Sequence, residues 1–247
     1  MTTAALIVAR LSSTRLPAKN LMPFAGNPMI QHLIDRVRKS AKVDDVVIAT
    51  SVEASDDPLE EFAVREGVSC HRGPLDNVME RICGAARAAS ADTIVEILGD
   101  NPLTHADLVD EVITKYETEN LDYAANISGD YAVRPADLAL FAIGIRVQVY
   151  ATSLAEKYID YPDVKGHPSS YIFDNPDTFK CGYIEATGKW ASLHKPDINL
   201  AVNYRENFDA VAQIFEDLLK DNADFTLPDV GTYLDQHPDL YKLLGPQ

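Results

Sequence analysis

Cysteine is scarce in this chain and gives no pairing pattern. The three cysteines, Cys70, Cys83 and Cys181, are odd in number and show no C-x-x-C spacing. Disulfide frameworks and zinc sites need paired or clustered thiols, so we expect neither. Sparse, unpaired cysteine is typical of reducing compartments, and we expect a cytoplasmic protein.

Long apolar runs are absent as well. No stretch approaches the roughly 20 apolar residues that cross a bilayer. The apolar segment at 4–8 has no basic region before it and is too short for a signal peptide. We therefore expect no membrane partner.

Basic side chains are few and unevenly placed. The 247 residues hold 22 Lys and Arg against 38 Asp and Glu, a net charge of −16, which argues against nucleic-acid binding because that needs a basic surface. Residues 1–42 reverse this balance, with Asp35 as their single acid. Their basic residues are Arg10, Arg15, Lys19, Arg36, Arg38, Lys39 and Lys42. A cationic patch in an acidic chain favours a small anionic ligand. We interpret Arg36, Arg38 and Lys39 as the solvated face of a helix.

Short β-branched runs alternate with segments of helical spacing in the first half of the chain. This pattern predicts strands at 3–8, 45–49, 68–70, 93–97 and 123–125. It predicts a helix that starts at Pro28 behind the cap Asn27, and helices at 57–67, 75–89 and 106–119. Such alternation builds right-handed βαβ units, so we expect an α/β fold with a mostly parallel sheet covered on both faces. Ligands of such sheets bind beyond the carboxyl ends of the strands.

The pattern is less regular after about residue 130. It predicts strands at 141–150 and 179–184, a strand at 198–202 that returns to the main sheet, helices at 152–159 and 207–219, and short surface helices in the last 25 residues. We expect a single domain over 1–247. It would comprise a regular half at 1–128, an irregular extension at 129–220 and C-terminal helices at 221–247.

The loop after the first strand concentrates positive charge. Arg10, Arg15 and Lys19 lie within ten residues, among small hydroxyl residues that leave backbone N–H groups accessible. Backbone amides and cationic side chains together hold phosphate groups. Neither G-x-x-x-x-G-K-[ST] nor G-x-G-x-x-G is present. The pattern indicates a phosphate site, and the alternative is a solvated basic loop.

A second polar loop follows the fourth strand. Asp100 comes directly after Gly99, which permits close approach of the backbone. A carboxylate in this place is suited to holding Mg²⁺ against phosphates. The alternative is a turn aspartate, which the sequence Asp100-Asn101-Pro102 also favours.

Together the two loops resemble a known family. A-R-x-x-S-x-R-L-P-x-K at 9–19 and G-D-x-P-L at 99–103 are similar to the cytidylyltransferases that activate acidic sugars. These include the CMP-3-deoxy-octulosonate and CMP-sialate synthetases and the spore-coat polysaccharide synthesis protein F group. Segments 47–51 and 72–81 agree, and the resemblance covers roughly 4–220. It implies a three-layer Rossmann-like nucleotide-diphospho-sugar transferase fold, a Mg²⁺ cofactor, and a small irregular extension for sugar binding and dimerisation within 129–220, with the dimer built through 130–175.

The resemblance also implies site residues. Nucleotide contacts are implied for Ala9, Arg10, Ser13, Arg15, Lys19, Ala49, Thr50, Ser51, Arg72 and Asp76. Of these, Arg10, Arg15 and Lys19 would act in catalysis together with Asp100, which would hold Mg²⁺.

Two arginines keep alternatives at this point. Arg72 is equally suited to a salt bridge with Asp76 at the entry of a helix. Arg81 lies on that helix and is suited either to the site or to pairing with Glu80 or Asp76.

The second half departs from the family pattern. Asn203 stands where the family usually has a second metal-binding aspartate, which leaves Asn203 or the nearby Asp197 as the second ligand. Gln148, His167 and Tyr171 are implied to bind the acceptor, but Gln148 replaces an acid of the spore-coat relatives. His167 has the alternative of an exposed polar residue.

The activity implied is CMP transfer from CTP to a 2-keto-3-deoxy sugar acid, with release of pyrophosphate, for surface polysaccharide biosynthesis. The expected partners are CTP, an acidic sugar and a second copy of the chain. The alternatives are a transferase that uses another nucleoside triphosphate or anionic acceptor, and a relative that binds nucleotide sugars without turnover.

Overall fold

The computed structural model describes residues 1–131, 133–160 and 169–245. Its strands are β1 (Thr3–Val8), β2 (Pro23–Phe24), β3 (Asn27–Pro28), β4 (Asp45–Ser51), β5 (Ser69–Gly73), β6 (Thr93–Leu98), β7 (Tyr123–Asn126), β8 (Val147–Ala151) and β9 (Cys181–Ile184). Its α-helices are α1 (Met29–Val37), α2 (Asp57–Glu66), α3 (Val78–Ala88), α4 (Ala106–Glu119), α5 (Thr152–Lys157), α6 (Ser170–Phe173), α7 (Arg205–Asp221), α8 (Leu227–Gln236) and α9 (Tyr241–Leu244). Short 3₁₀ turns lie at Lys19–Leu21, Ala54–Asp56, Gly188–Leu193 and Pro238–Leu240.

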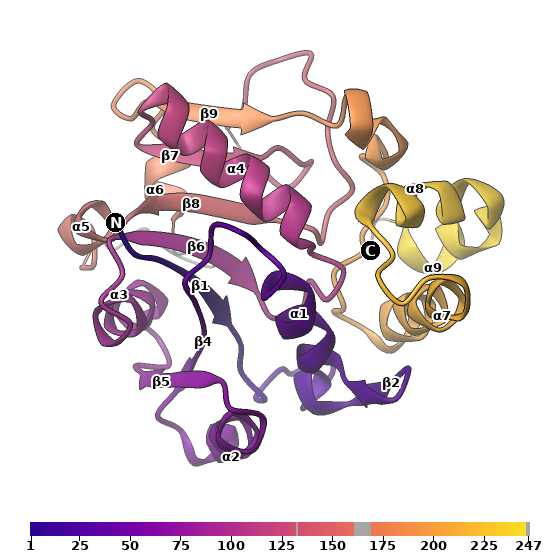
Figure 1. Cartoon of the computed structure of the whole chain (residues 1–247), viewed down its shortest axis with the longest axis horizontal. Coiled ribbons are helices and arrows are strands. Elements are labelled where there is room, and N and C mark those ends of the chain that lie inside the picture. The colour runs from indigo at the N-terminus through magenta and orange to yellow at the C-terminus, as the bar shows by residue number, and fades with distance from the viewer. Residues whose placement is uncertain (132, 161–168, 246–247) are drawn as a thin grey trace.

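Seven strands form the central sheet, in the order β5-β4-β1-β6-β8-β7-β9 (Figure 1). β1 pairs in parallel with β4 and β6, β4 with β5, and β7 with β9. In the described part of the chain, β8 alone runs against the others, antiparallel to both β6 and β7. The predicted mostly parallel sheet is confirmed. Because β8 is reversed, its first residue, Val147, pairs with Ile97 at the carboxyl end of β6.

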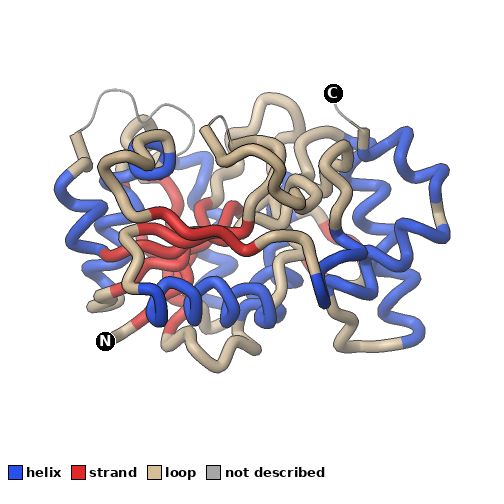
Figure 2. The backbone as a smooth tube through the Cα atoms, turned by 90° about the horizontal axis from the view of Figure 1, so that it is seen from above, coloured by secondary structure: helices blue, strands red, loops and turns tan. Residues whose placement is uncertain are grey.

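Helices cover both faces of the sheet, as predicted for a three-layer fold. Side chains of β1 alternate between the faces, with Ala5 and Ile7 in one core and Ala4 and Leu6 in the other. The first core is closed by α1, α2 and α4, and the second by α3, α5 and α6. Helices α7, α8 and α9 gather at one end of the molecule, beside the sheet (Figures 1 and 2). Along the described residues, no helix combines the length and apolar content needed to cross a bilayer.

The first helix starts one residue later than predicted. Asn27 and Pro28 pair with Phe24 and Pro23 in the two-stranded ribbon, and Pro28 is the N-cap rather than the first helical residue. Its ψ of 145° is extended, since the ribbon holds this segment before the chain turns into α1.

The strand predicted at 141–150 is shorter in the structure. Only Val147–Ala151 joins the sheet, as β8. The extended run is interrupted at Gly144, whose φ of +91° is a conformation that L side chains rarely adopt. Before it, Phe141 and Ile143 form only isolated bridges, to Ser128 and Asn199. The segment 198–202 is therefore not the strand of the sheet that was predicted, and its bridge joins it only to the chain before β8.

The interpretation of Arg36 as a solvated residue is wrong. Its side chain is buried and donates to the carbonyl oxygens of Leu103 and Phe225, at 3.1 and 2.9 Å. The guanidinium also lies 4.3 Å from the ring centroid of Phe225, and burial lowers the pKa of Arg36 to about 9. Arg36 thus ties α1 to the C-terminal helices. Those helices are not surface additions, because Leu227, Val230 and Leu234 are part of the first core.

Candidate active site

A cavity of about 640 Å³ opens at the carboxyl edge of the sheet. It is lined by the loop after β1, the end of β6 and its following loop, the start of α3, the segment before β8, and residues 201 and 203. β1 and β6 end at this edge because they are parallel, and the segment before β8 reaches it because β8 is reversed. This is where α/β sheets bind ligands.

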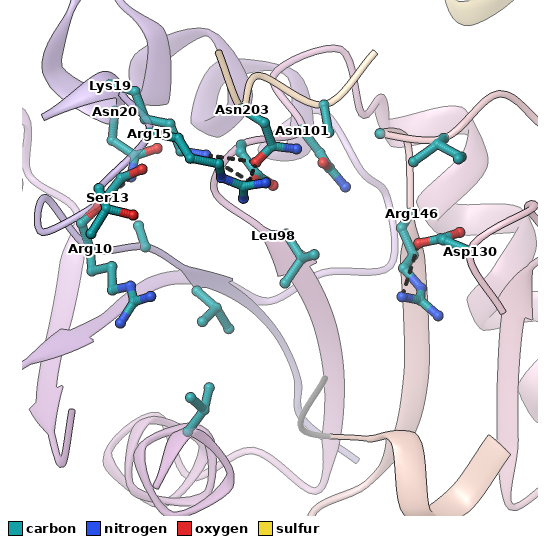
Figure 3. Close-up of a pocket in the computed structure, with 18 of the residues that line it drawn as sticks. Arg10, Ser13, Arg15, Lys19, Asn20, Leu98, Asn101, Asp130, Arg146 and Asn203 are labelled. Carbon is teal, nitrogen blue, oxygen red and sulfur yellow. Dashed lines mark hydrogen bonds and ion pairs between the residues drawn. The ribbon is translucent and has the colours of Figure 1, made fainter. Parts of the chain in front are cut away.

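The structure brings most of the predicted nucleotide and metal residues to this cavity. Those that line it are Ala9, Arg10, Ser13, Arg15, Lys19, Asp76, Asp100 and Asn203. Figure 3 shows the first-loop side chains beside Asn203 on one side, with Arg146 and Asp130 on the other. The lining also includes residues that the sequence did not single out, among them Asn20, Asn101, Asp130 and Arg146.

Lys19 is almost enclosed, with a side chain that is 9% exposed. Its Nζ donates to Val202 O at 2.6 Å and to Asp100 Oδ2 at 3.0 Å, with a longer contact to Asn203 Oδ1 at 3.4 Å. Since an ammonium group has three donor hydrogens, each one has a protein acceptor here. In this state Lys19 neutralises Asp100 and holds the first loop against residues 202 and 203.

Arg15 is the second cation bound to Asn203. Its Nη2 donates to Asn203 Oδ1 at 2.7 Å, and its guanidinium lies 5.3 Å from the ring centroid of Tyr204. The amide oxygen predicted to contact a metal therefore accepts from two cations. Asp197, the alternative second ligand, is exposed and does not line the cavity.

Asp100 retains an oxygen that is suited to a cation. Its Oδ1 is buried and has no hydrogen-bond partner among the residues that the structure describes, and the same holds for Asn20 Oδ1 and Asn101 Oδ1. No group of three or more His, Cys, Asp or Glu side chains within this part of the chain is placed to hold a metal by itself. Because Mg²⁺ prefers oxygen ligands and is usually bound by one or two carboxylates plus substrate phosphates, this donor set fits Mg²⁺ only together with a phosphate ligand.

Gly99 sets the distance between the two loops. A Cβ at this position would lie 2.8 Å from Ala9 Cβ and 3.2 Å from Asn20 Oδ1. The chain can place Asp100 beside the first loop only because residue 99 has no side chain. The close approach predicted for Gly99 is confirmed.

Arg10 and Arg81 form a second group of cations in the cavity. Arg81 is buried, donates to Pro74 O at 3.3 Å, and forms no ion pair with the described acids, including Glu80 and Asp76. Burial, and after it the positive charge of Arg10, lowers the pKa of Arg81. Two arginines that repel each other in one cavity are stabilised by a bound anion.

The residues 49–51 do not line the cavity. Ala49, Thr50 and Ser51 are fully buried, so the prediction that they contact the nucleotide is corrected. Ser51 instead donates its backbone N–H at 3.2 Å and its hydroxyl to Asp56, whose other oxygen accepts from Leu11 N at 2.7 Å. The sequence reasoning missed Asp56 as the buried carboxylate that fixes the start of the first loop.

Arg72 is also turned away from the cavity. Its guanidinium pairs with Asp57 at 2.7 Å and Glu60 at 2.8 Å and donates to Ser51 O at 2.9 Å. The alternative of a salt bridge with Asp76 is wrong in its partner, because the two acids that pair with Arg72 lie on α2. Arg72 links β5 to β4 and α2 behind the first loop.

The predicted acceptor residues are placed elsewhere. Gln148 is fully buried in β8, and its Oε1 accepts from Tyr123 at 2.7 Å and Ser169 at 2.9 Å, so it has no surface for a substrate. Tyr171 packs against Tyr158 with ring centroids 4.5 Å apart and does not line the cavity. His167 lies outside the described residues.

The wall of the cavity opposite the cationic loop instead shows Arg146 and Asp130. The two side chains form an ion pair at 3.2 Å, and the Arg146 guanidinium lies 3.8 Å from the ring centroid of Tyr131. Asp130 also accepts from Ser128 in the loop that follows β7. The irregular sequence after 126 gave no signal for this pair, because its position depends on the reversal of β8.

Comparison with known proteins agrees with this geometry. The family model described as cytidylyltransferase matches residues 4–181. The spore coat polysaccharide biosynthesis protein SpsF of Bacillus subtilis is 26% identical over 240 residues, which are 95% of this chain and 94% of that protein. The 3-deoxy-manno-octulosonate cytidylyltransferase of Geobacter metallireducens is 34% identical over 113 residues, 46% of this chain and 44% of that enzyme.

Solved structures give the same result. A cytidylyltransferase from Leptospira borgpetersenii superposes with a TM-score of 0.81 at 25% identity, over 100% of this chain and 98% of that one. A CMP:2-keto-3-deoxy-manno-octonic acid synthetase complexed with CTP shares the fold, with a TM-score of 0.65 at 19% identity over 89% of this chain and 100% of that one. The chain belongs to the cytidylyltransferase family and is a nucleotidyltransferase.

Proposed function

We propose that this enzyme transfers CMP from CTP to an acidic sugar of the 2-keto-3-deoxy type, with Mg²⁺ as its cofactor. The observation that carries the proposal is the convergence of Arg10, Arg15 and Arg81 on one cavity beside Asp100, whose Oδ1 has no partner among the described residues. Cations of this number favour a polyphosphate over a singly charged ligand. The names of the relatives support CTP and a sugar acid as the reactants.

In the proposed reaction, a hydroxyl oxygen of the acceptor bonds to the α-phosphorus of CTP. The bond between that phosphorus and the bridging oxygen breaks, pyrophosphate leaves, and the hydroxyl proton passes to solvent. The protein contributes position and charge neutralisation. Arg10, Arg15 and Arg81 would bind the phosphates, which they reach from two walls of the cavity.

Asp100 and the amide oxygen of Asn203 would hold Mg²⁺, which would neutralise charge that develops on the phosphates. The expected homodimer and cytoplasmic location stay predictions. Arg146 and Asp130 lie opposite the cationic loop (Figure 3), and their polar groups support this wall of the cavity as the acceptor side.

Thermal melts with each of the four ribonucleoside triphosphates and Mg²⁺ test the nucleotide. At about 100 times its dissociation constant, a ligand of the folded state adds about 2.7 kcal/mol of stability, or about 5–10 °C in Tm for a domain of this size. We expect this rise with CTP and a smaller one with ATP, GTP and UTP. A larger rise with ATP, GTP or UTP than with CTP would favour the alternative of a transferase that uses another nucleoside triphosphate.

Pyrophosphate release tests the acceptor. We expect it with CTP and a sugar acid from a panel that includes 3-deoxy-manno-octulosonate and N-acetylneuraminate. Tight CTP binding without turnover on any sugar acid would favour the alternative of a relative that binds nucleotide sugars but does not catalyse transfer.

Arg81→Met gives a separate test of the anion site. We expect the variant to bind CTP more weakly by roughly 1.5–3 kcal/mol, the scale of a lost charge-assisted hydrogen bond. We expect its Tm without nucleotide to be unchanged or higher, because the lowered pKa of Arg81 shows that the fold disfavours its charge. Calorimetric CTP titration and thermal melts measure both. A lower Tm together with wild-type CTP affinity would make Arg81 a structural residue.

A further inference from the structure

The ammonium group of Lys19 sits in a shell of protein oxygens. Three oxygens of three chemical kinds surround it, the carboxylate Oδ2 of Asp100, the carbonyl of Val202 and the amide Oδ1 of Asn203. Carboxylate, carbonyl and amide oxygens are also the ligands of hard divalent cations. An internal cation therefore occupies an oxygen cluster of the kind that binds a metal.

The oxygen cluster is built from separate parts of the fold and is held together independently of Lys19. Val202 N donates to Asp100 O at 2.9 Å, which joins the segment 201–203 to the loop after β6. Gly144 allows this segment to lie directly on the chain before β8, since a Cβ there would be 2.0 Å from Ala201 N. Loss of the lysine side chain would thus leave the three oxygens in place.

The charge of the cluster balances with Lys19 present. Within the cluster, Asp100 supplies one negative charge and Lys19 one positive charge, while Asn203 is neutral. The exposed Arg15, which donates to Asn203 at 2.7 Å, adds a further positive charge at the rim. A divalent ion added to this cluster would meet a buried ammonium group within a few ångströms, and such repulsion is strong where water is excluded. The neutral residue at 203 supplies no second charge to offset it.

We propose that Lys19 is the resident cation of this cluster and that it excludes divalent metal until a nucleotide binds. This inference rests on the proposed function, because the triphosphate is the ligand that would draw Lys19 and Arg15 away from Asp100 and Asn203. Asp100, together with the phosphates, would then hold the metal. Lys19 acts in this way as a positioning residue that sets the order of binding.

Manganese titration of the nucleotide-free protein, followed by electron paramagnetic resonance, tests the proposal. Mn²⁺ is a spectroscopic probe with the same preference for oxygen ligands as Mg²⁺. We expect weak Mn²⁺ binding to the wild type and binding at least about tenfold tighter to Lys19→Met, because the buried ammonium charge beside Asp100 is gone and only the exposed Arg15 remains at the cluster. Lys42→Met is the matched control. It removes a lysine from an ion pair with Glu117 outside the cavity and should bind Mn²⁺ like the wild type.

A second variant covers the case in which Lys19→Met does not fold, which circular dichroism will show. Asn203→Asp keeps Lys19 and adds a negative charge to the same cluster, so it should also bind Mn²⁺ more tightly than the wild type. Tight Mn²⁺ binding to the nucleotide-free wild type would overturn the proposal. So would wild-type Mn²⁺ affinity in whichever of the two variants is folded.

CTP titrations of the wild type, run in parallel, separate this inference from the proposed function. Absence of CTP binding would remove the proposed function, whereas the Mn²⁺ comparison in the nucleotide-free protein would still decide whether Lys19 is the resident cation. With CTP present, we expect Mn²⁺ to bind the wild type at least about tenfold more tightly than without it, because the phosphates add negative charge and ligands.

Discussion

Asp100→Asn is expected to lower kcat for nucleotidyl transfer at least about 100-fold, an increase of roughly 2.7 kcal/mol in the barrier. Asp100 follows β6 and lines the cavity beside the first loop, and its Oδ1 has no partner among the described residues. The amide keeps the size of the side chain and an oxygen for Lys19, but it brings no negative charge to a cation that stabilises the transition state. The loss should therefore fall on kcat more than on CTP affinity. Pyrophosphate release with saturating CTP and the active sugar acid measures it.

Asp209→Asn serves as the control for this substitution. Asp209 pairs with Arg205 on the exposed face of α7, away from the cavity, and its amide variant should keep the wild-type kcat. Retention of more than about a tenth of the activity in Asp100→Asn, a barrier change below roughly 1.4 kcal/mol, would reduce Asp100 to the turn residue that its sequence context also allowed.

Gly144→Ala is expected to destabilise the fold by about 3–5 kcal/mol. Two effects combine at this position. The φ of +91° is strained for any residue with a Cβ, at about 1–3 kcal/mol. The added methyl would also meet Ala201 N at 2.0 Å and Leu200 C at 2.4 Å, backbone atoms that must move, and such overpacking costs another 1–3 kcal/mol or so. Thermal melts should show a Tm lowered by roughly 10 °C.

Gly188→Ala separates the two effects. Gly188 also has a positive φ, of +55°, but a Cβ there has no atom within 4 Å. Its alanine variant should lose only the backbone part, about 1–2 kcal/mol. Because the segment at 201–203 borders the cavity, Gly144→Ala should weaken CTP binding as well, and Gly188→Ala should not. Equal Tm values for the two variants would show that the segment 200–201 adapts without cost.

The regular half of the fold could be predicted because its signals are local. Strands at 3–8, 45–51 and 93–98 are apolar runs of the length that a buried parallel strand needs, and the helices between them carry one apolar stripe each. Parallel strands end at one edge, so the loops with Lys19 and Asp100 had to meet there. The sequence could also indicate which residues carry positive charge. It could not indicate that Arg36 is buried, because its carbonyl partners at 103 and 225 are far away in the chain.

What the sequence by itself determined is the α/β architecture, the cationic loop and the carboxylate beside it, since each depends on neighbouring residues and on the shared direction of parallel strands. Only the tertiary structure decided which of these groups act on one another. Arg15 and Lys19 meet Asn203 across more than 180 residues of chain, and Arg146 reaches the cavity because β8 runs against its neighbours. Gln148 and Ser51 were predicted to bind ligands, but both are buried. The position of a polar residue along a strand does not specify which face of the sheet its side chain occupies or what covers it. Contacts of this kind are fixed by packing between distant segments, and they carry no signature in the local sequence.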